Sequence, residues 1–338
     1  MIMGNRAGLI TALVLLIVLL LMPQIAPRVG LAISVCTEVL LYAIAAMAVN
    51  LLIGYTGVLP FGNAAFFGLG AYGAGLSIEY LHVGFIASIV LGMIASFVGA
   101  LLIGPFLLRR RGIYFALLMI AFGQVFYFIA YRFTDITGGE DGMNFARPAV
   151  EGLGVVLKDQ QFYYAMLVVF ALVMIGFLLL VRSPFGRTLL AIKENETRAR
   201  YLGLNTDRFI FVALLISAIM EGLAGACYGL SIMFAYPLML DWHNSGNIVL
   251  MTILGGSGTL FGPFIGAVIF VVGQEILSTH WIWWQIPLGA LFVACVLGFP
   301  KGILGTALDL FSKRRGGFAS EARELVHGTT YSEREIVP

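Results

Sequence analysis

Charged residues are scarce in this chain. Asp, Glu, Lys and Arg together make up 11% of its 338 residues, whereas apolar residues make up 60%. A soluble domain carries about 25% charged residues, so this chain has too few to cover a surface that faces water on all sides. The formal net charge of +2 is too small to indicate a nucleic-acid partner. The composition argues against a soluble enzyme and a nucleic-acid-binding protein, and it predicts an all-α, polytopic protein of the lipid bilayer.

Cysteine and histidine are also sparse. The three cysteines lie in separate apolar runs and the four histidines form no set with ligand spacing, so the sequence indicates no disulfide, metal site or bound cofactor. No nucleophile, base and acid stand in an arrangement typical of a hydrolase, and we expect the chain not to be an enzyme. No lysine completes the Gly-x-x-x-x-Gly-Lys-Ser/Thr motif of an ATP-binding loop. If ATP drives this protein, a partner binds the ATP.

Apolar stretches fill residues 1–311, whereas the tail 312–338 is polar. A crossing needs about 20 apolar residues, and the stretches predict about ten crossings. Within 242–300 we expect breaks near Gly255–Gly258 and near Ser278–His280, and the glycines of 57–78 leave a re-entrant segment as an alternative to a crossing. The predicted spans are 7–27, 31–53, 57–78, 83–108, 112–131, 160–181, 209–236 and three within 242–300.

Basic residues are distributed unequally between alternate loops. If the N-terminus lies in the cytoplasm, the cytoplasmic segments hold 16 of the 20 Lys and Arg residues. Lys and Arg are enriched in the cytoplasmic loops of membrane proteins, so we predict that both termini are cytoplasmic. The loop 132–160, which carries five acidic residues, then lies outside.

The loop between the sixth and seventh predicted spans has the pattern of a short amphipathic helix. Ser183 before Pro184 is a favoured start and Gly203 is a favoured end. The pattern fits either a solvated loop helix or a helix that a partner protein holds and through which force reaches the neighbouring spans. The pattern has Leu189, Ile192, Ala199 and Leu202 on one face, with Glu194–Arg198 and Glu196–Arg200 as ion pairs four residues apart.

Four blocks with distinctive residues stand in order along the chain. Together they resemble the motifs of the LivM family of branched-chain amino acid permeases, which are membrane subunits of ABC importers, and the third block resembles that family's coupling segment, here 183–208. The resemblance covers roughly residues 40–305. The blocks are Gly54–Tyr72; Gly112–Ala116 with Thr137–Gly142; Ala191–Glu196 with Gly203, Ser217-Ala218 and Gly222–Gly225; and Gly255–Ala267.

The resemblance implies an ABC importer permease fold over residues 1–311, in the plasma (inner) membrane of a bacterium. It implies a second, homologous permease subunit as partner and two ABC ATPase subunits that dock on the cytoplasmic side and use the ATP. It also implies a periplasmic or extracellular substrate-binding protein that delivers the substrate. The residues that it assigns to ATPase coupling are Arg187, Ala191, Lys193, Glu194, Asn195, Glu196, Arg200 and Gly203.

Candidate pathway residues lie in the Gly-rich blocks and in the seventh span. Glu221 stands where the family usually has a small residue, and Ala218, Gly222 and Gly225 beside it form a small-residue seam for packing against another helix. We expect Glu221 to face protein, either in the pathway or as a structural acid. The pathway candidates are Gly62, Asn63, Phe67, Tyr114 and Glu221; the candidates for an outer docking or gating loop, or only a tight turn, are Thr137, Gly138, Gly139, Asp141 and Gly142.

The favoured function is import of branched-chain or related hydrophobic amino acids. Pro60, Asn63 and Met119 differ from the residues common in the family, which leaves urea or another small solute open as the substrate. A further alternative is an ion-coupled secondary transporter. It would use an acid within a span, Glu38, Glu221 or Glu275, as its proton or sodium site and would need no docking helix.

Overall fold

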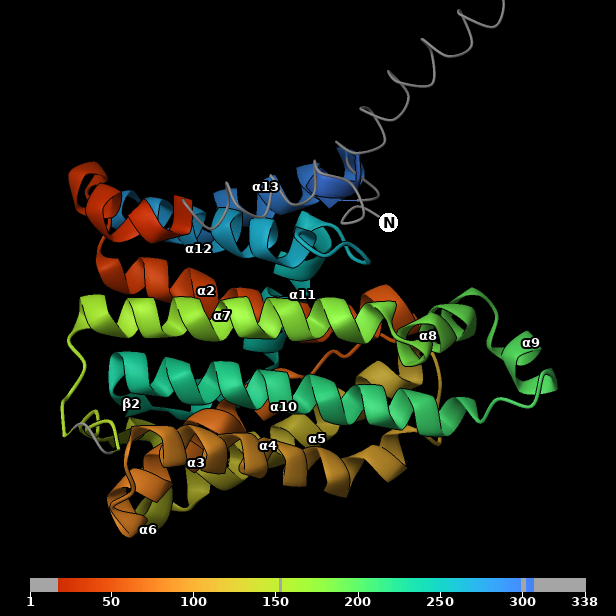
Figure 1. The fold of residues 1–338 in the computed structure, drawn as a ribbon, viewed down its shortest axis with the longest axis horizontal. Coiled ribbons are helices and arrows are strands. Elements are labelled where there is room, and N and C mark those ends of the chain that lie inside the picture. The colour runs from red at the N-terminus through yellow and green to blue at the C-terminus, as the bar shows by residue number, and fades with distance from the viewer. Residues whose placement is uncertain (1–17, 152–153, 299–301, 307–338) are drawn as a thin grey trace, which may run out of the picture.

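The computed structural model describes residues 18–151, 154–298 and 302–306 as a bundle of helices whose long axes run roughly parallel (Figure 1). Among these residues, six helical segments of 19 to 27 residues are long and apolar enough to cross a membrane. They are α2 (Ile33–Asn50) continued by the π-helical turn η2 (Leu51–Thr56), α4 (Phe85–Leu107), α5 (Ile113–Arg132), α7 (Asp159–Arg182), α10 (Thr206–Ile232) and α12 (Gly262–His280).

Shorter elements connect these helices. They are η1 (Ala26–Val29), α3 (Ala64–Leu81), α6 (Thr134–Thr137), η3 (Gly139–Asp141), β1 (Met143–Asn144), α8 (Pro184–Glu194), α9 (Glu196–Tyr201), β2 (Phe234–Ala235), η4 (Pro237–Leu240), α11 (Trp242–Gly255) and α13 (Gln285–Gly298). Strands β1 and β2 form an antiparallel ribbon with Met143 opposite Ala235. The ribbon lies at one end of the bundle, the ribbon end, and helices α8 and α9 project from the opposite end, the α8–α9 end (Figure 1).

The helix positions confirm much of the predicted division of the chain. Each predicted span between 83 and 236 contains one long helix that ends within four residues of the predicted limits, and 242–300 contains α11, α12 and α13 with the two expected breaks. The span 7–27 is only partly described, and the tail 312–338 lies outside the described residues. Because α3, α11 and α13 are not among the six candidate spans, ten crossings stay a prediction.

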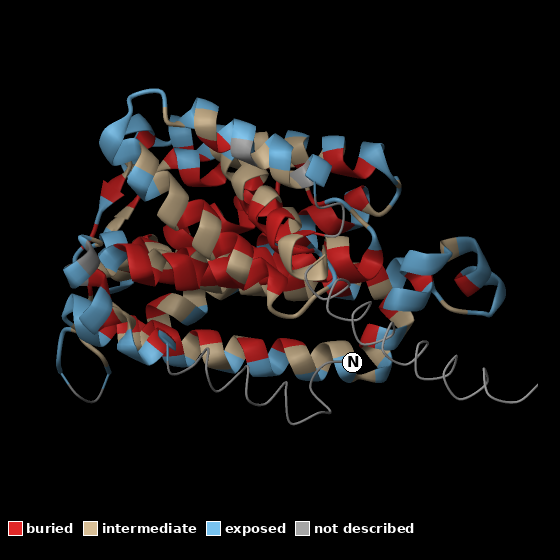
Figure 2. Ribbon diagram, turned by 90° about the horizontal axis from the view of Figure 1, so that it is seen from above, coloured by how far each residue is buried: buried red, intermediate tan, exposed pale blue. Residues whose placement is uncertain are grey.

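Helix α2 lies at the centre of the bundle. It packs against α7, α10 and α12. In the most apolar stretch of α2 and its continuation η2, 83% of the residues are buried, compared with 28% in the corresponding stretches of α5 and α7. Figure 2 shows the buried residues concentrated in the middle of the bundle and the exposed ones on the outer helices. Outer positions such as Leu117, Phe128, Leu172 and Leu179 expose apolar side chains, as expected for surfaces that contact hydrocarbon or another membrane subunit.

Helices α3, α4 and α10 pack most closely where their residues are small. A Cβ atom on Gly70 of α3 would lie 2.7 Å from the Cα atom of Gly222 in α10, and one on Gly225 would overlap the backbone carbonyl of Phe67. In a membrane, close backbone approach of this kind replaces the hydrophobic driving force that holds soluble helices together. The contacts confirm the small-residue seam predicted on α10.

Two helices begin inside the bundle rather than at its ends. An irregular segment, 57–63, precedes α3 and places Gly62 with φ of +121° against the backbone of Met119 in α5. Before α11, Leu240 lies against Gly68 of α3. Irregular backbone at membrane depth is tolerated where protein covers it or where it lines a cavity. The two interrupted segments therefore meet in the protein interior.

Candidate functional site

Residues 183–208 form two helices instead of the single helix that the sequence predicts. The Ser183 hydroxyl accepts a hydrogen bond from the Gly186 N–H (3.3 Å) and begins α8 as expected. Asn195 then adopts an extended conformation with φ of −161°, and its side chain caps α9 by accepting from the Arg198 N–H (2.8 Å). The predicted Glu194–Arg198 pair is wrong, because this break separates the two residues and no such ion pair occurs within the described residues.

The apolar face of this helix pair is mostly as predicted. Leu189, Ile192 and Ala199 are buried, but Leu202 is 76% exposed. Leu202 follows the last residue of α9, and Gly203 with φ of +84° turns the chain away at that point. The opposite surface carries exposed polar residues and projects from the bundle. The coupling candidates that are exposed are Arg187, Ala191, Lys193, Glu194, Asn195, Arg200 and Gly203.

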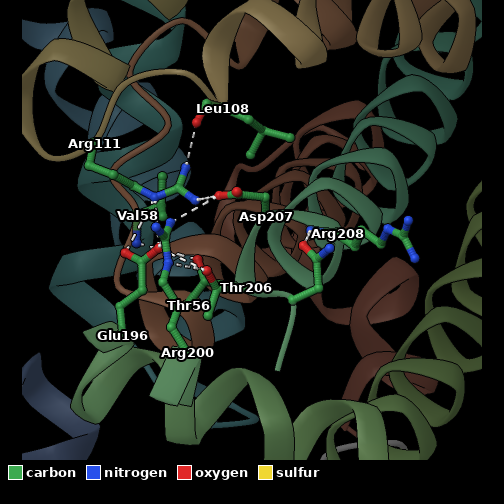
Figure 3. Close-up of polar contacts among 10 residues, drawn as sticks. Thr56, Val58, Leu108, Arg111, Glu196, Arg200, Thr206, Asp207 and Arg208 are labelled. Carbon is green, nitrogen blue, oxygen red and sulfur yellow. Dashed lines mark hydrogen bonds and ion pairs between the residues drawn. The ribbon is translucent and has the colours of Figure 1, made fainter. Parts of the chain in front are cut away.

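A network of charged side chains centres on Glu196 (Figure 3). Arg111, in the turn between α4 and α5, donates to Glu196 through Nε (3.0 Å) and to the Leu108 carbonyl through Nη1 (3.0 Å), and it also pairs with Asp207 at the start of α10. The predicted Glu196–Arg200 pair is present at 2.9 Å. The network therefore ties α9 both to the α4–α5 turn and to the first turn of α10.

The charge state of Glu196 is stabilised by these contacts. Burial alone would raise the pKa of Glu196, but the hydrogen bond and the positive charge of Arg111 lower it, as do hydrogen bonds from Thr206 and Arg200. The net effect holds the pKa of Glu196 below its ordinary value. Glu196 stays ionised at neutral pH and keeps its partners in place.

Helix α8 is also attached to the end of α2. The Lys193 ammonium donates to the Gly54 carbonyl in η2 (2.7 Å). The last residue of α2 also contacts the loop after α11, because the Asn50 side chain donates to the Thr259 carbonyl (2.9 Å) and accepts from the Gly258 N–H (2.7 Å). Three sequence blocks that are far apart along the chain thus meet at the α8–α9 end.

A buried polar pair joins α10 to the residue that precedes α3. The Asn63 amide donates to Glu221 Oε1 at 2.6 Å, and neither side chain is exposed. Glu221 Oε2 and Asn63 Oδ1 have no hydrogen-bond partner in the part of the chain that the structure describes. Glu221 therefore faces protein, as the small residues around it predict, and the structure brings two of the five pathway candidates into direct contact.

The other pathway candidates are dispersed. Phe67 is buried one turn into α3 and stacks on Tyr42 of α2, with 5.7 Å between the ring centroids. Gly62 forms the turn before Asn63. Tyr114 is 66% exposed near the start of α5, and no aromatic or hydrogen-bond contact within the described residues links it to the others.

The predicted outer loop is a set of tight turns at the ribbon end. The Thr137 hydroxyl donates to the carbonyls of Ala130 and Phe133 (both 2.6 Å). Gly138, Gly139 and Gly142 have φ between +63° and +75°, which favours glycine. Asp141 is exposed beside them, immediately before the ribbon. The geometry fits the turn expected from the sequence, and a docking or gating role stays a prediction.

A buried cation near this loop was not predicted from the sequence. Arg147 donates to the carbonyls of Leu230 (3.1 Å) and Ser231 (3.0 Å), which end α10, and pairs with Asp159 (3.2 Å). Neither Arg147 nor Arg111 was among the candidate residues, because each entered the sequence argument only through the count of basic residues on the two sides of the membrane. No short sequence motif marks these contacts, because Arg147 lies 83 positions from Leu230 and Arg111 lies 85 positions from Glu196.

The fold and these sites define a multi-pass membrane protein with a projecting, polar helix pair at one end. Residues 31–297 match the family described as branched-chain amino acid transport system / permease component. The chain therefore belongs to this family of permeases.

Individual relatives agree with this assignment. The chain is 30% identical to the high-affinity branched-chain amino acid transport system permease protein LivM of Salmonella typhimurium, over 81% of this chain and 70% of the relative. It is 25% identical to LivH of the same organism, over 78% of this chain and 91% of the relative. The guanosine ABC transporter permease protein NupQ of Bacillus subtilis is 25% identical, over 58% of this chain and 55% of the relative. No solved structure matches the chain.

Proposed function

We propose that this chain is one of two related permease subunits of an ATP-driven importer that carries branched-chain or related hydrophobic amino acids across a bacterial plasma membrane. Membership of the permease family and similarity to both LivM and LivH support this function. The second permease subunit is the structural counterpart against which this chain packs. A substrate-binding protein delivers the amino acid from outside.

The α8–α9 end faces the cytoplasm and the ribbon end faces outward. Arg109, Arg110, Arg111 and the basic residues of α8 and α9 lie at the first of these ends, in agreement with the enrichment of Lys and Arg in cytoplasmic loops. The chain crosses about ten times, because α3, α11, α13 and the span that begins at residue 7 join the six long helices. The turn from Thr137 to Gly142 then faces the substrate-binding protein.

The observation that carries the proposal is the projecting helix pair. Its outer surface is exposed and polar, while Glu196 and Lys193 tie it to three segments of the bundle. Two ABC ATPase subunits bind and hydrolyse the ATP, and the chain itself holds no cofactor and performs no catalysis. Movement of an ATPase against α8 and α9 is transmitted through Arg111 to α4 and α5 and through Asp207 to α10.

Asn63 and Glu221 set the position of α3 relative to α10 in the pathway region. Both are fully buried in this conformation, so they act by holding helices together rather than by lining open space. Gly62 and Phe67 belong to the same contact region. Tyr114 lies on the outer surface of α5, where the partner permease subunit or lipid covers it.

Uptake of labelled leucine into proteoliposomes tests the proposal. The vesicles contain this chain, its partner permease and the ATPase subunits, with ATP on the cytoplasmic side and the substrate-binding protein on the other. We expect uptake that requires ATP and persists in the presence of a protonophore. Uptake that a protonophore abolishes despite ATP would instead support the ion-coupled alternative, with its coupling site at an acid within a span. ATP hydrolysis without leucine uptake would contradict the assignment of leucine as a substrate. Urea and guanosine are then the next solutes to test.

A further inference from the structure

A polar chamber opens beside α2 in the half of the bundle nearer the ribbon end. Its volume is about 500 Å³, within the range of roughly 300–1,000 Å³ typical of small-molecule sites. Helices α2, α10, α11 and α12 and the segment β2–η4 contribute its walls. Among the polar groups that line it are Glu38, Tyr42, Tyr228, Tyr236, Asn244 and Asn247.

The two carboxylates of the chamber differ in their partners. Asp241 accepts a hydrogen bond from Gln124 (2.9 Å) and forms an ion pair with His243. Glu38 forms no ion pair within residues 18–151, 154–298 and 302–306. A carboxylate inside a membrane protein is costly unless a cation or a proton compensates it. Glu38 is therefore the group in this chamber that is suited to a cationic ligand.

Tyrosine rings line the chamber together with Glu38. Tyr42 and Tyr228 meet edge to face with 5.5 Å between centroids, and Phe67 stacks behind Tyr42. The Tyr42 hydroxyl donates to Asn244 (3.4 Å), which fixes the ring against α11. The faces of such rings attract an ammonium group, so they reinforce the preference of Glu38 for a cation.

The rest of the lining suits the other parts of a hydrophobic amino acid. Met251, Phe270 and Val271 provide a buried apolar wall. Asn247 and Gln274 present amide groups that can donate to a carboxylate. One cavity thus combines an acid for an amine, amides for a carboxylate and an apolar surface for a side chain.

We propose that this chamber is a substrate-binding station within the permease, in which Glu38 binds the ammonium group of a hydrophobic amino acid. The inference rests on the proposed function and extends it by placing a specific substrate contact in this chain. Recognition of the substrate is then not confined to the substrate-binding protein. The chamber selects an amine a second time, on the way through the membrane.

Equilibrium binding to the purified permease–ATPase complex in nanodiscs, with the substrate-binding protein left out, tests this proposal. The probes are labelled leucine and 2-hydroxy-4-methylpentanoate, which has a hydroxyl in place of the ammonium group. In Glu38→Gln we expect leucine affinity to fall at least about tenfold, the effect of losing one charge-assisted contact. The affinity for the hydroxy acid should change less than about threefold, because that ligand has no ammonium group to lose.

Two further variants control for structural damage. Glu38→Asp keeps the negative charge and should retain a preference for leucine over the hydroxy acid. Glu79→Gln removes an exposed carboxylate on α3 that does not line the chamber, and it should bind both ligands as the wild type does.

Several results would overturn the chamber assignment. They are absence of leucine binding to the wild-type complex, wild-type leucine affinity in Glu38→Gln, or an equal loss of both ligands in that variant. ATP-driven leucine uptake is measured on the same preparation with the substrate-binding protein added. Normal wild-type uptake without chamber binding refutes only the chamber, whereas absence of uptake refutes the proposed function.

Discussion

Two carboxylates of this protein, Glu196 and Glu221, each connect segments that are far apart in the sequence, but in opposite surroundings. Glu196 has two arginines and a threonine as partners and is 29% exposed as a side chain. Glu221 is fully buried, and the Asn63 amide is its one hydrogen-bond partner among the described residues. Glu196 has several partners and is partly accessible to water, whereas Glu221 depends on a single contact.

The difference indicates how each region responds to movement. Ion pairs near water contribute little to stability, about 0–1 kcal/mol each, and they can exchange partners at low cost. A buried polar group that loses its partner costs about 1–3 kcal/mol. We therefore expect the Glu196 network to permit rearrangement between helices, and the Asn63–Glu221 pair to fix one arrangement of α3 and α10.

The largest effect is expected from opening the helix contact that surrounds the buried pair. In Gly225→Val, the new side chain would overlap the backbone of Phe67, so α3 and α10 cannot approach. Overpacking typically costs about 1–3 kcal/mol or more, and backbone cannot move aside as a side chain does. We expect most of the folded protein to be lost, measured as monodisperse yield by size-exclusion chromatography.

Gly176→Val is the matched control for this substitution. Gly176 is a helical glycine of α7, and an added Cβ atom would meet no atom within 4 Å. Its yield should equal that of the wild type. Equal yields of the Gly176 and Gly225 variants would show that close packing at the buried pair is not required.

Removal of the buried carboxylate should give the next largest effect. Glu221→Ala leaves the Asn63 amide without its acceptor, and we expect a loss of about 1–3 kcal/mol in the free energy of unfolding. Glu221→Gln keeps an acceptor and adds a donor that can satisfy Asn63 Oδ1, so it should be as stable as the wild type. Thermal unfolding in nanodiscs measures both, with the exposed Glu79→Ala as control. An alanine variant as stable as the wild type would remove the structural role of the pair.

A smaller, local effect is expected from the partly exposed network around Glu196. Arg111→Ala detaches α9 from the α4–α5 turn, while Arg200 stays within reach of both Glu196 and Asp207. Global stability should change by less than about 1 kcal/mol, but amide hydrogen exchange in α9 should become faster. The substitution Arg110→Ala, at a neighbouring residue that is exposed, should leave exchange unchanged. Unaltered exchange in Arg111→Ala would mean that the network does not hold α9.

The smallest effect is expected from pH. The pKa of Glu196 is lowered in the folded protein relative to the ordinary value of roughly 4.3. Its contribution to the attachment of α9 is therefore fully present above the ordinary pKa and is lost as pH falls through the lower, folded value. Exchange in α9, corrected for its intrinsic pH dependence, should stay constant between pH 8 and pH 5 and rise only in stronger acid. A rise near neutral pH would contradict the ionised state of Glu196.

The sequence predicts the local features of this fold better than its distant contacts. The long helices, the breaks within 242–300, the cap at Ser183 and the Glu196–Arg200 pair all follow from patterns within a few residues. The break at Asn195 was not predicted, because the charge pattern continues across it and an asparagine can either cap a helix or lie within one. The exposure of Leu202 follows from the same short α9.

Contacts between residues that are far apart in the sequence could be identified only in the folded structure. Glu196 meets Arg111 across 85 positions, and Glu221 meets Asn63 across 158. Helical periodicity says nothing about which helices become neighbours at such separations. The small residues on α10 did predict a close helix contact, but neither its partner helix nor the role of Asn63 as the hydrogen-bond donor.

The ratio of leucine transported to ATP hydrolysed tests most directly whether the α8–α9 segment couples the ATPases to the bundle. It is measured in one reconstituted system for the wild type, for the double reversal Glu194→Lys and Glu196→Lys, and for Glu221→Gln. We expect the double reversal to retain ATP hydrolysis and lose leucine uptake, while Glu221→Gln keeps the wild-type ratio. Normal uptake in the double reversal would contradict coupling through this segment.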